Sequence, residues 1–279
     1  EWEWTDDGKT LTLYLRKGMK WSDGAPFTVD DIIFWWEDIE NDPEITAAPH
    51  AEWVVNGKPM ELEKVDDFTI KLKFDGPNGL AETVGLAFHG NQWPLGFERF
   101  GFFAPRHYLE QFHPKYNTDN LDAMVADAGF STWVELFQSK YGSRQSNGAG
   151  WTNPDLPVIY AWRITEPAGG DVARAVCERN PYYWKVDTEG NQLPYIQRIE
   201  WEFLGDPEVL LLRTLNGEVE FMNYYANSLQ NKSVLFDNME AGNYHFFDQI
   251  RDQAVTVAID LNQNTSNEAL REVFRSKDF

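Results

Sequence analysis

Histidines and paired acids are the residues of this sequence whose types could support chemistry. The five histidines are His50, His89, His107, His113 and His245. Their spacing is not that of metal ligands, so no metal site is expected. The pairs Asp30–Asp31 and Asp66–Asp67 could act as glycosidase carboxylates. Each pair lies where a helix cap or a turn commonly uses Asp, so we favour a structural role for both.

The other reactive features also favour structural roles. The chain has one cysteine, Cys177, so it can form neither an intrachain disulfide nor a thiolate cluster. The alternation around it predicts a strand and an inert, half-buried thiol. Residues 187–191 resemble a calcium loop but lack its spaced ligands, which favours a polar turn. The motifs of serine hydrolases, zinc proteases and P-loop proteins are absent, so we expect no enzyme and no cofactor.

Composition excludes several classes of protein. The 24 Lys and Arg residues against 45 Asp and Glu give a net charge of −21, which argues against binding nucleic acid or anionic lipid. Hydrophobic residues make up 42% and aromatic residues 15%, too many for a disordered chain. A length of 279 residues fits one or two domains. The 12 Trp residues indicate a large core and raise the odds of a flat-faced binding cleft.

Neither a membrane span nor a signal peptide is visible in the sequence. No window holds the roughly 18 apolar residues of a membrane span. The sequence starts at Glu1 rather than Met, and its last periodic segment runs to Phe279. We interpret it as an internal fragment, so the absence of a signal peptide carries no weight.

The first half of the chain shows both strand and helix patterns. Residues 10–16 alternate and predict a strand. Thr28 and Asp31 form a capping box that predicts a helix over 29–39, in which Trp36 is buried, as is Trp21 before it. Strands joined by a turn at Asp66–Asp67 predict a hairpin over 62–74. Further helices are expected from Pro105, over 119–128 and over 132–140, the last from a second capping box of Thr132 and Glu135.

The second half is richer in strand patterns. Strands are expected at 156–164, 172–179, 196–204, 218–222, 244–248 and 253–261. Asp206 and Pro207 predict the start of a helix that stops at Gly217. Two more helices are expected, near 228–241 and after Ser266. The irregular alternation of strands and helices predicts a mixed α/β (α+β) fold.

One stretch is more specific than any of these patterns. Residues 15–39 read LRKGMKWSDGAPFTVDDIIFWWEDI, which resembles the signature segment of the family 5 extracellular solute-binding proteins. The resemblance continues in order along the chain, at LEKVDDFTIKLKF (62–74), APRHYL (104–109), RNPYYWKVDTEGNQLPYIQRI (179–199), NGEVEF (216–221) and NEALREVFRSKDF (267–279). These segments are most similar to the long, oligopeptide-binding subgroup of the family.

The resemblance implies a fold like that of type II periplasmic binding proteins, with the second ligand-binding lobe missing from this chain. It assigns residues 1–105 to the small extra domain of the family. Residues 106–279 are assigned to the incomplete middle segment of the first ligand-binding lobe. In such proteins, ligand binds in the cleft between two lobes and the lobes close by a hinge motion.

The resemblance also implies a function and a location. The protein is expected to capture oligopeptides or oligosaccharides outside the membrane and to deliver them to the membrane permease of an ABC importer. It is expected to be a monomer in the periplasm or a lipoprotein at the cell surface. Peptide and sugar ligands both stay open, and the alternative function is that of a carbohydrate-active enzyme or a lectin-like module.

Five candidate ligand-binding residues follow from the resemblance. The segment after Gly217–Phe221 faces the ligand in this family, and here it contains Asn223, Tyr224 and Tyr225. The irregular segment 46–53 matches another cleft-facing region and contains His50 and Trp53. If residues 218–222 formed a strand that continued further, one of the two tyrosines would face the cleft and the other the core.

Overall fold

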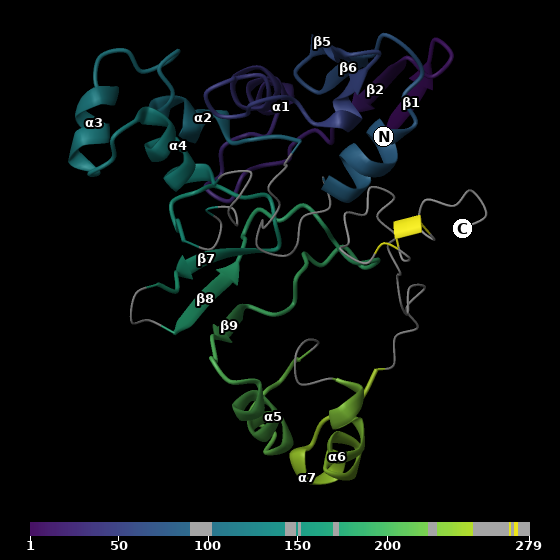
Figure 1. The fold of residues 1–279 in the computed structure, drawn as a ribbon, viewed down its shortest axis with the longest axis vertical. Coiled ribbons are helices and arrows are strands. Elements are labelled where there is room, and N and C mark those ends of the chain that lie inside the picture. The colour runs from purple at the N-terminus through teal and green to yellow at the C-terminus, as the bar shows by residue number, and fades with distance from the viewer. Residues whose placement is uncertain are drawn as a thin grey trace. The chain divides into compact units, whose positions relative to one another are not determined.

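The computed structural model describes residues 1–89, 102–142, 149, 152–169, 173–222, 228–247, 268 and 271–272. The chain divides into two compact units, Glu1–Phe203 and Leu204–Phe279. Figure 1 colours the chain from its N-terminus to its C-terminus and labels the α-helices and most of the strands.

A four-stranded antiparallel sheet forms the start of the first unit, in the order β1-β2-β6-β5. Its strands are β1 (Trp2–Thr5), β2 (Thr10–Tyr14), β5 (Glu61–Asp66) and β6 (Thr69–Lys73). Leu11 pairs with Leu72 and Leu13 with Ile70, so the alternating apolar residues of the two central strands share one buried face. The expected strand at 10–16 and the expected hairpin are confirmed, and β1 is an additional strand.

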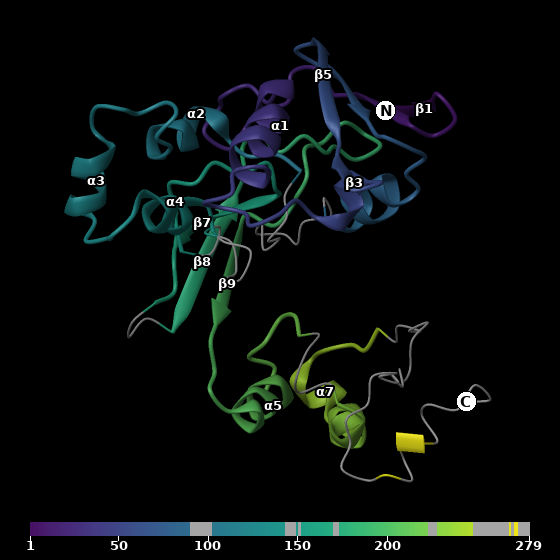
Figure 2. The same cartoon turned by 45° about the horizontal axis from the view of Figure 1, so that its top comes forward.

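A helix packs beside this sheet, as Figure 2 shows. It comprises α1 (Val29–Trp35) and continues as a π-helical turn, η1 (Trp36–Glu40). The capping box of Thr28 and Asp31 is present, which confirms the predicted helix start. Trp21 is 2% exposed and Trp36 is 5% exposed, so both are buried as expected.

A short irregular region and four small elements follow η1. These are η2 (Ala51–Trp53), β3 (Val54–Val55), β4 (Lys58–Pro59) and the π-helical η3 (Ala81–His89). Strands β3 and β4 form a two-stranded antiparallel sheet of their own.

The next three helices of the first unit match the predictions. Their bounds are α2 (Arg106–Leu109), extended by the 3-10 turn η4 (Glu110–Phe112), α3 (Leu121–Asp127) and α4 (Trp133–Tyr141). A second capping box, formed by Thr132 and Glu135, starts α4. Helices α3 and α4 contact each other, and α2 contacts both α1 and α4.

The first unit ends in a three-stranded antiparallel sheet in the order β7-β8-β9. Its strands are β7 (Trp162–Glu166), β8 (Arg174–Arg179) and β9 (Arg198–Glu202). The strand expected at 156–164 therefore begins only at Trp162. The backbone of Val158 is bonded to Ser22 instead of a strand, and Pro157 has no N–H to donate.

The described part of the second unit contains short helices. These are α5 (Pro207–Leu215), the 3-10 turn η6 (Leu229–Asn231), α6 (Lys232–Asp237) and α7 (Met239–Gly242). Asp206 caps α5 as predicted. The helix expected near 228–241 is present but interrupted at Asn238.

Two predicted strands of the second unit are wrong. Residues 218–222 and 244–247 are not strands, because neither segment has a ladder partner among the described residues. The N–H of Glu218 is bonded to Arg213 O at the end of α5, and Phe221 is 82% exposed. Tyr224 and Tyr225, the strand expected at 253–261 and most of the helix expected after Ser266 lie outside the described residues.

The main hydrophobic core lies in the first unit and runs from Leu11 to Leu156. It joins residues on both sides of position 105, including Phe102 and Leu109. The assignment of 1–105 and 106–279 to two parts of the family architecture stays a prediction.

Candidate functional site

His50 and Trp53, two of the five predicted ligand-binding residues, lie together at η2 but point in different directions. Trp53 is 2% exposed, and its ring packs against Trp35 and Phe102 at centroid distances of 5.9 and 5.3 Å. Gly85 of η3 is essential to this packing, because a Cβ there would lie 2.4 Å from the Trp53 ring. Trp53 is thus part of the core, and its contact with a ligand stays a prediction that requires a change of packing.

The side chain of His50 is held by a buried carboxylate. Glu40 Oε1 accepts hydrogen bonds from both the backbone N–H of His50, at 2.7 Å, and its Nδ1, at 2.5 Å. The side chain of Glu40 is 4% exposed and that of His50 is 12% exposed. A carboxylate bound at Nδ1 fixes the orientation of an imidazole ring. Ligand binding by His50, and by Asn223, Tyr224 and Tyr225 outside the described residues, stays a prediction.

Glu40 belongs to the π-helical turn η1, which also carries the buried Asp38. The wider turn is marked by the hydrogen bond from Asn41 N to Trp36 O, which spans five residues. The amide of Asn41 donates a second bond to the same carbonyl. This turn buries the acidic side chains of Asp38 and Glu40 beside Trp36 and Ile39, whereas Glu37 is exposed.

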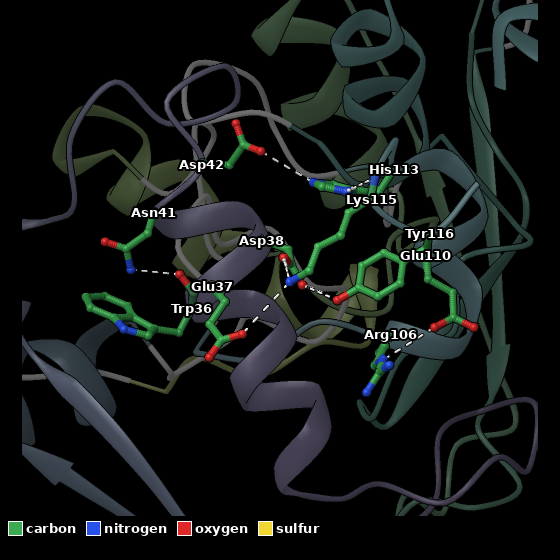
Figure 3. A network of polar contacts seen from close by, with 10 residues as sticks. All are labelled: Trp36, Glu37, Asp38, Asn41, Asp42, Arg106, Glu110, His113, Lys115 and Tyr116. Atoms are coloured by element: carbon green, nitrogen blue, oxygen red, sulfur yellow. Dashed lines mark hydrogen bonds and ion pairs between the residues drawn. The ribbon is translucent and has the colours of Figure 1, made fainter. Parts of the chain in front are cut away.

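Figure 3 shows the network around Asp38. Lys115 Nζ lies 2.6 Å from Asp38 Oδ1, and the hydroxyl of Tyr116 donates to Oδ2 at 2.5 Å. Hydrogen bonding to Asp38 raises the pKa of Lys115, and burial together with Asp38 raises the pKa of Tyr116. Glu37 lies 4.0 Å from Lys115 at the edge of the network. Asp38 thus ties η1 to the segment that follows η4.

His113 completes this network from the buried side. Its ring is 3% exposed and lies among Phe34, Trp133 and Phe137. Nδ1 accepts the backbone N–H of Lys115 at 3.2 Å, so the neutral ring carries its proton on Nε2. Nε2 faces Asp42 Oδ2 at 3.4 Å without forming a hydrogen bond.

A third buried acid, Asp31, holds the start of α1. Oδ2 accepts the Thr28 N–H at 2.9 Å and the Trp21 indole N–H at 3.2 Å, and Oδ1 accepts the Arg106 N–H at 3.1 Å. Burial raises the pKa of Asp31, and these three donors oppose that rise. Asp31 is therefore a structural residue, as its place in a helix cap predicts.

Asp38, Glu40 and Lys115 were not among the residues predicted from the sequence. The available signal was a set of three acids, Glu37, Asp38 and Glu40, beside Trp36 and Ile39 at the end of an apolar helix. A buried acidic side chain needs a hydrogen-bond or ionic partner. The local sequence around the acid does not show which distant residue is that partner.

No group of three or more His, Cys, Asp or Glu side chains in the described ranges could hold a metal ion. Asp187 uses its carboxylate within its own turn, where it accepts from Glu189 N, Asn191 N and the hydroxyl of Tyr195. Within the described part of the chain, no helix is long and apolar enough to cross a membrane.

Comparison with known proteins defines the class. The whole chain, residues 1–279, matches the family described as "Bacterial extracellular solute-binding proteins, family 5 Middle". The chain belongs to this family, whose members are solute-binding proteins, and the mixed fold of helices and sheets is the one expected for it.

Among the similar proteins, some are named for binding sugars and others for binding oligopeptides. The periplasmic alpha-galactoside-binding protein of Rhizobium meliloti (strain 1021) is 32% identical over 201 residues, which cover 72% of this chain and 24% of that protein. A solved oligopeptide-binding protein OppA is 33% identical, with a TM-score of 0.73 over 88% of this chain and 36% of the other. The periplasmic binding protein MelB of Agrobacterium fabrum C58, in complex with stachyose, is 28% identical, with a TM-score of 0.57 over 85% and 30%. The chain thus spans about a quarter to a third of the length of these relatives.

Proposed function

We propose that the protein is the solute-binding component of an ABC importer. It captures an oligosaccharide or an oligopeptide outside the cytoplasmic membrane and delivers it to the membrane permease. The observation that carries this proposal is the family match over all 279 residues. The protein acts without catalysis, as a monomer, in the periplasm or as a lipoprotein at the cell surface.

The relatives narrow the ligand to two chemical classes. One is an alpha-galactoside, by the name of the Rhizobium protein, and the other is an oligopeptide, by the name of OppA. A trap for either class would use aromatic rings against sugar faces or peptide planes. His50, Trp53, Asn223, Tyr224 and Tyr225 are the proposed contacts on this part of the chain.

A thermal-shift experiment on the full-length protein separates the two classes. Stachyose and a mixture of tripeptides to pentapeptides are added separately, each at up to about 1 mM. A ligand at 100 times its dissociation constant stabilises the folded state by about 2.7 kcal/mol. A rise in melting temperature with one class identifies the ligand, and no shift with either class would contradict both readings.

A paired substitution then tests the site. His50→Ala should weaken the identified ligand by about 10-fold if the ring contacts it, since one good hydrogen bond to a charged or oriented group contributes about 1.4 kcal/mol. His107→Ala, at an exposed histidine paired with Asp23, is the matched control and should leave affinity unchanged. Equal affinities for the two variants would exclude His50 from the site. Hydrolysis of chromogenic glycosides by the full-length protein would instead support the carbohydrate-active alternative.

A further inference from the structure

A group of cations in the first unit stands apart from the rest of this acidic chain. Most described Lys and Arg side chains lie within ion-pair distance of a carboxylate: Lys58, Lys64, Lys71, Lys73, Arg106, Lys115, Arg163, Arg174, Arg198 and Arg213. Arg16, Lys20 and Lys185 are exposed, and no carboxylate of the described residues lies within ion-pair distance of them. Because the chain has 45 acidic and only 24 basic residues, three neighbouring cations without a carboxylate partner among the described residues are unexpected from composition alone.

These three cations rest on aromatic rings. Arg16 Cζ lies 5.1 Å from the centre of the Trp184 ring, and Lys185 Nζ lies 5.1 Å from the same ring. Lys20 Nζ lies 5.2 Å from the centre of the Tyr182 ring. Because both charges lie 5.1 Å from the centre of the Trp184 ring, Arg16 Cζ and Lys185 Nζ are at most about 10 Å apart. We call these five residues the cation–aromatic patch.

Two segments distant in sequence build the patch, and both are fixed. Asn180 is fully buried; its amide donates to Tyr160 O at 2.9 Å, and its carbonyl accepts the Tyr182 N–H at 2.8 Å. Gly24, with φ +93°, lets the Tyr182 ring approach the turn after Lys20, where a Cβ would lie 3.1 Å from the hydroxyl. The charged groups are thus held in place before any partner arrives, which lowers the entropy cost of binding.

The contacts with the rings involve the faces of the cations, and their side-chain N–H donors have no partner among the described residues. A guanidinium stacked on an indole uses its face, and its N–H edge can still bind a carboxylate in a bidentate manner. Lys17, on the same loop, is not counted in the patch because its Nζ rests on another ring, that of Phe68 at 5.8 Å, in the turn between β5 and β6. It also helps lower the pKa of the Asp66 carboxyl at that turn.

We propose that the cation–aromatic patch is a docking surface for an acidic segment of a partner protein. A short anionic segment senses charges within a Debye length of about 8 Å, so the local cations dominate the interaction. An anionic membrane is an extended plane of charge and would also sense the net charge of −21, which opposes binding. This inference is independent of the solute that the protein carries.

The test measures binding of fluorescein-labelled hexaglutamate to the complete chain by anisotropy at about 0.15 M ionic strength, where the Debye length is about 8 Å. We expect salt-sensitive binding that weakens at least about 10-fold in the triple variant R16Q/K20Q/K185Q. The matched control K58Q/K71Q/K73Q removes the same charge from ion-paired positions on β4 and β6 and should change affinity less than about 2-fold. The double variant K20Q/K185Q keeps the Arg16 stack, and should weaken binding at least about 5-fold if the triple variant does not fold.

Three results would overturn the proposal. The first is no binding of hexaglutamate by the unmodified chain. The second is an equal loss in the patch variants and in the control, which would assign binding to overall charge. The third is binding to vesicles of phosphatidylglycerol without binding to hexaglutamate, which would identify a lipid surface instead.

Discussion

Two buried carboxylates on one helix are stabilised in different ways. Asp31 is held by three N–H donors and has no ion pair with the described residues, whereas Asp38 is held by Lys115 and the hydroxyl of Tyr116. Burial raises the pKa of Asp31, so ionisation of this side chain is less favourable in the folded state than in the unfolded chain. Its contribution to stability is complete below its unfolded pKa, near 4, and is lost as the pH rises through the folded-state pKa.

Lys115→Ala tests the importance of the Asp38 network. The substitution leaves a carboxylate with a 5% exposed side chain without its cation. We expect the free energy of unfolding at pH 7 to fall by about 1–3 kcal/mol, because a buried charged acceptor loses a partner. Urea denaturation measures the change.

The pH dependence and a control complete this test. Asp38 raises the pKa of Lys115, so the pair contributes fully below about pH 10.4 and its contribution is lost as the pH rises through the raised pKa. The difference between the two proteins should therefore shrink in strong alkali. Lys71→Ala, which breaks an exposed pair with Glu63, should cost less than about 0.5 kcal/mol. A Lys115→Ala effect no larger than this would refute the assignment.

Tyr195→Phe tests the turn at Asp187. The Tyr195 hydroxyl and Asn191 lower the pKa of Asp187 to about 2. Removing the hydroxyl should raise that pKa toward its ordinary value of about 4, which a pH titration of the carboxyl carbon by NMR measures. Stability linked to Asp187 is present above about pH 4 and lost as the pH falls through 2, so the variant should lose less on acidification. Tyr108→Phe, whose hydroxyl contacts Asn153, should leave the pKa of Asp187 unchanged.

Among the elements, the end of α5 depends on a close backbone contact. Gly217 has φ +73°, and a Cβ there would lie 2.4 Å from Gly242 O at the end of α7. Gly217→Ala should lower the free energy of unfolding of the second unit by more than about 1 kcal/mol, through both strain and steric overlap. Hydrogen exchange of the α5 and α7 amides measures this change.

The matched control for this prediction lies in the same unit. Gly205 has no atom within 4 Å of where its Cβ would be placed, and it does not have a left-handed backbone. Gly205→Ala should leave exchange unchanged or slow it slightly. If both variants exchange alike, the contact between Gly217 and Gly242 does not stabilise the unit.

Sequence patterns predicted helices and strands well where the pattern and the structure it forms lie in the same short segment. The capping boxes at Thr28 and Thr132 placed two helix starts, because the side chain that caps is adjacent to the helix it caps. Residues 218–222 alternate in the same way as a strand but form none, since a strand needs a partner that the sequence does not specify. The π-helical turn at Trp36–Glu40 was also not predictable, because it depends on tertiary packing and no local sequence pattern marks it.

The candidate site was less predictable than the fold. The resemblance selected the segment that contains His50 and Trp53, and the structure then sends Trp53 into the core and His50 toward Glu40. The partners of Asp38 lie more than 70 residues away, at Lys115 and Tyr116. Contacts over such separations depend on the packed fold and have no local pattern.

For the molecule as a whole, the net charge of −21 predicts a salt effect. Excess like charge destabilises the compact state by self-repulsion, and salt screens it. The melting temperature should rise as sodium chloride increases from about 0.02 to 0.2 M, as measured by circular dichroism. Potassium chloride at equal concentration should have the same effect. An unchanged or lower melting temperature in both salts would show that exposed ion pairs outweigh the repulsion.

The buried cysteine of β8 allows opening of the sheet to be measured by chemical labelling. Cys177 is the one thiol in the sequence, it is fully buried, and burial raises its pKa to about 12. Thiol reagents react with the thiolate, so the folded sheet should be unreactive and the labelling rate should report how often β7, β8 and β9 separate. In increasing urea, labelling should follow unfolding measured by Trp fluorescence, and rapid labelling of the native protein would contradict the burial. Fluorophores could then be attached at cysteines introduced on the surface while the native thiol stays unlabelled.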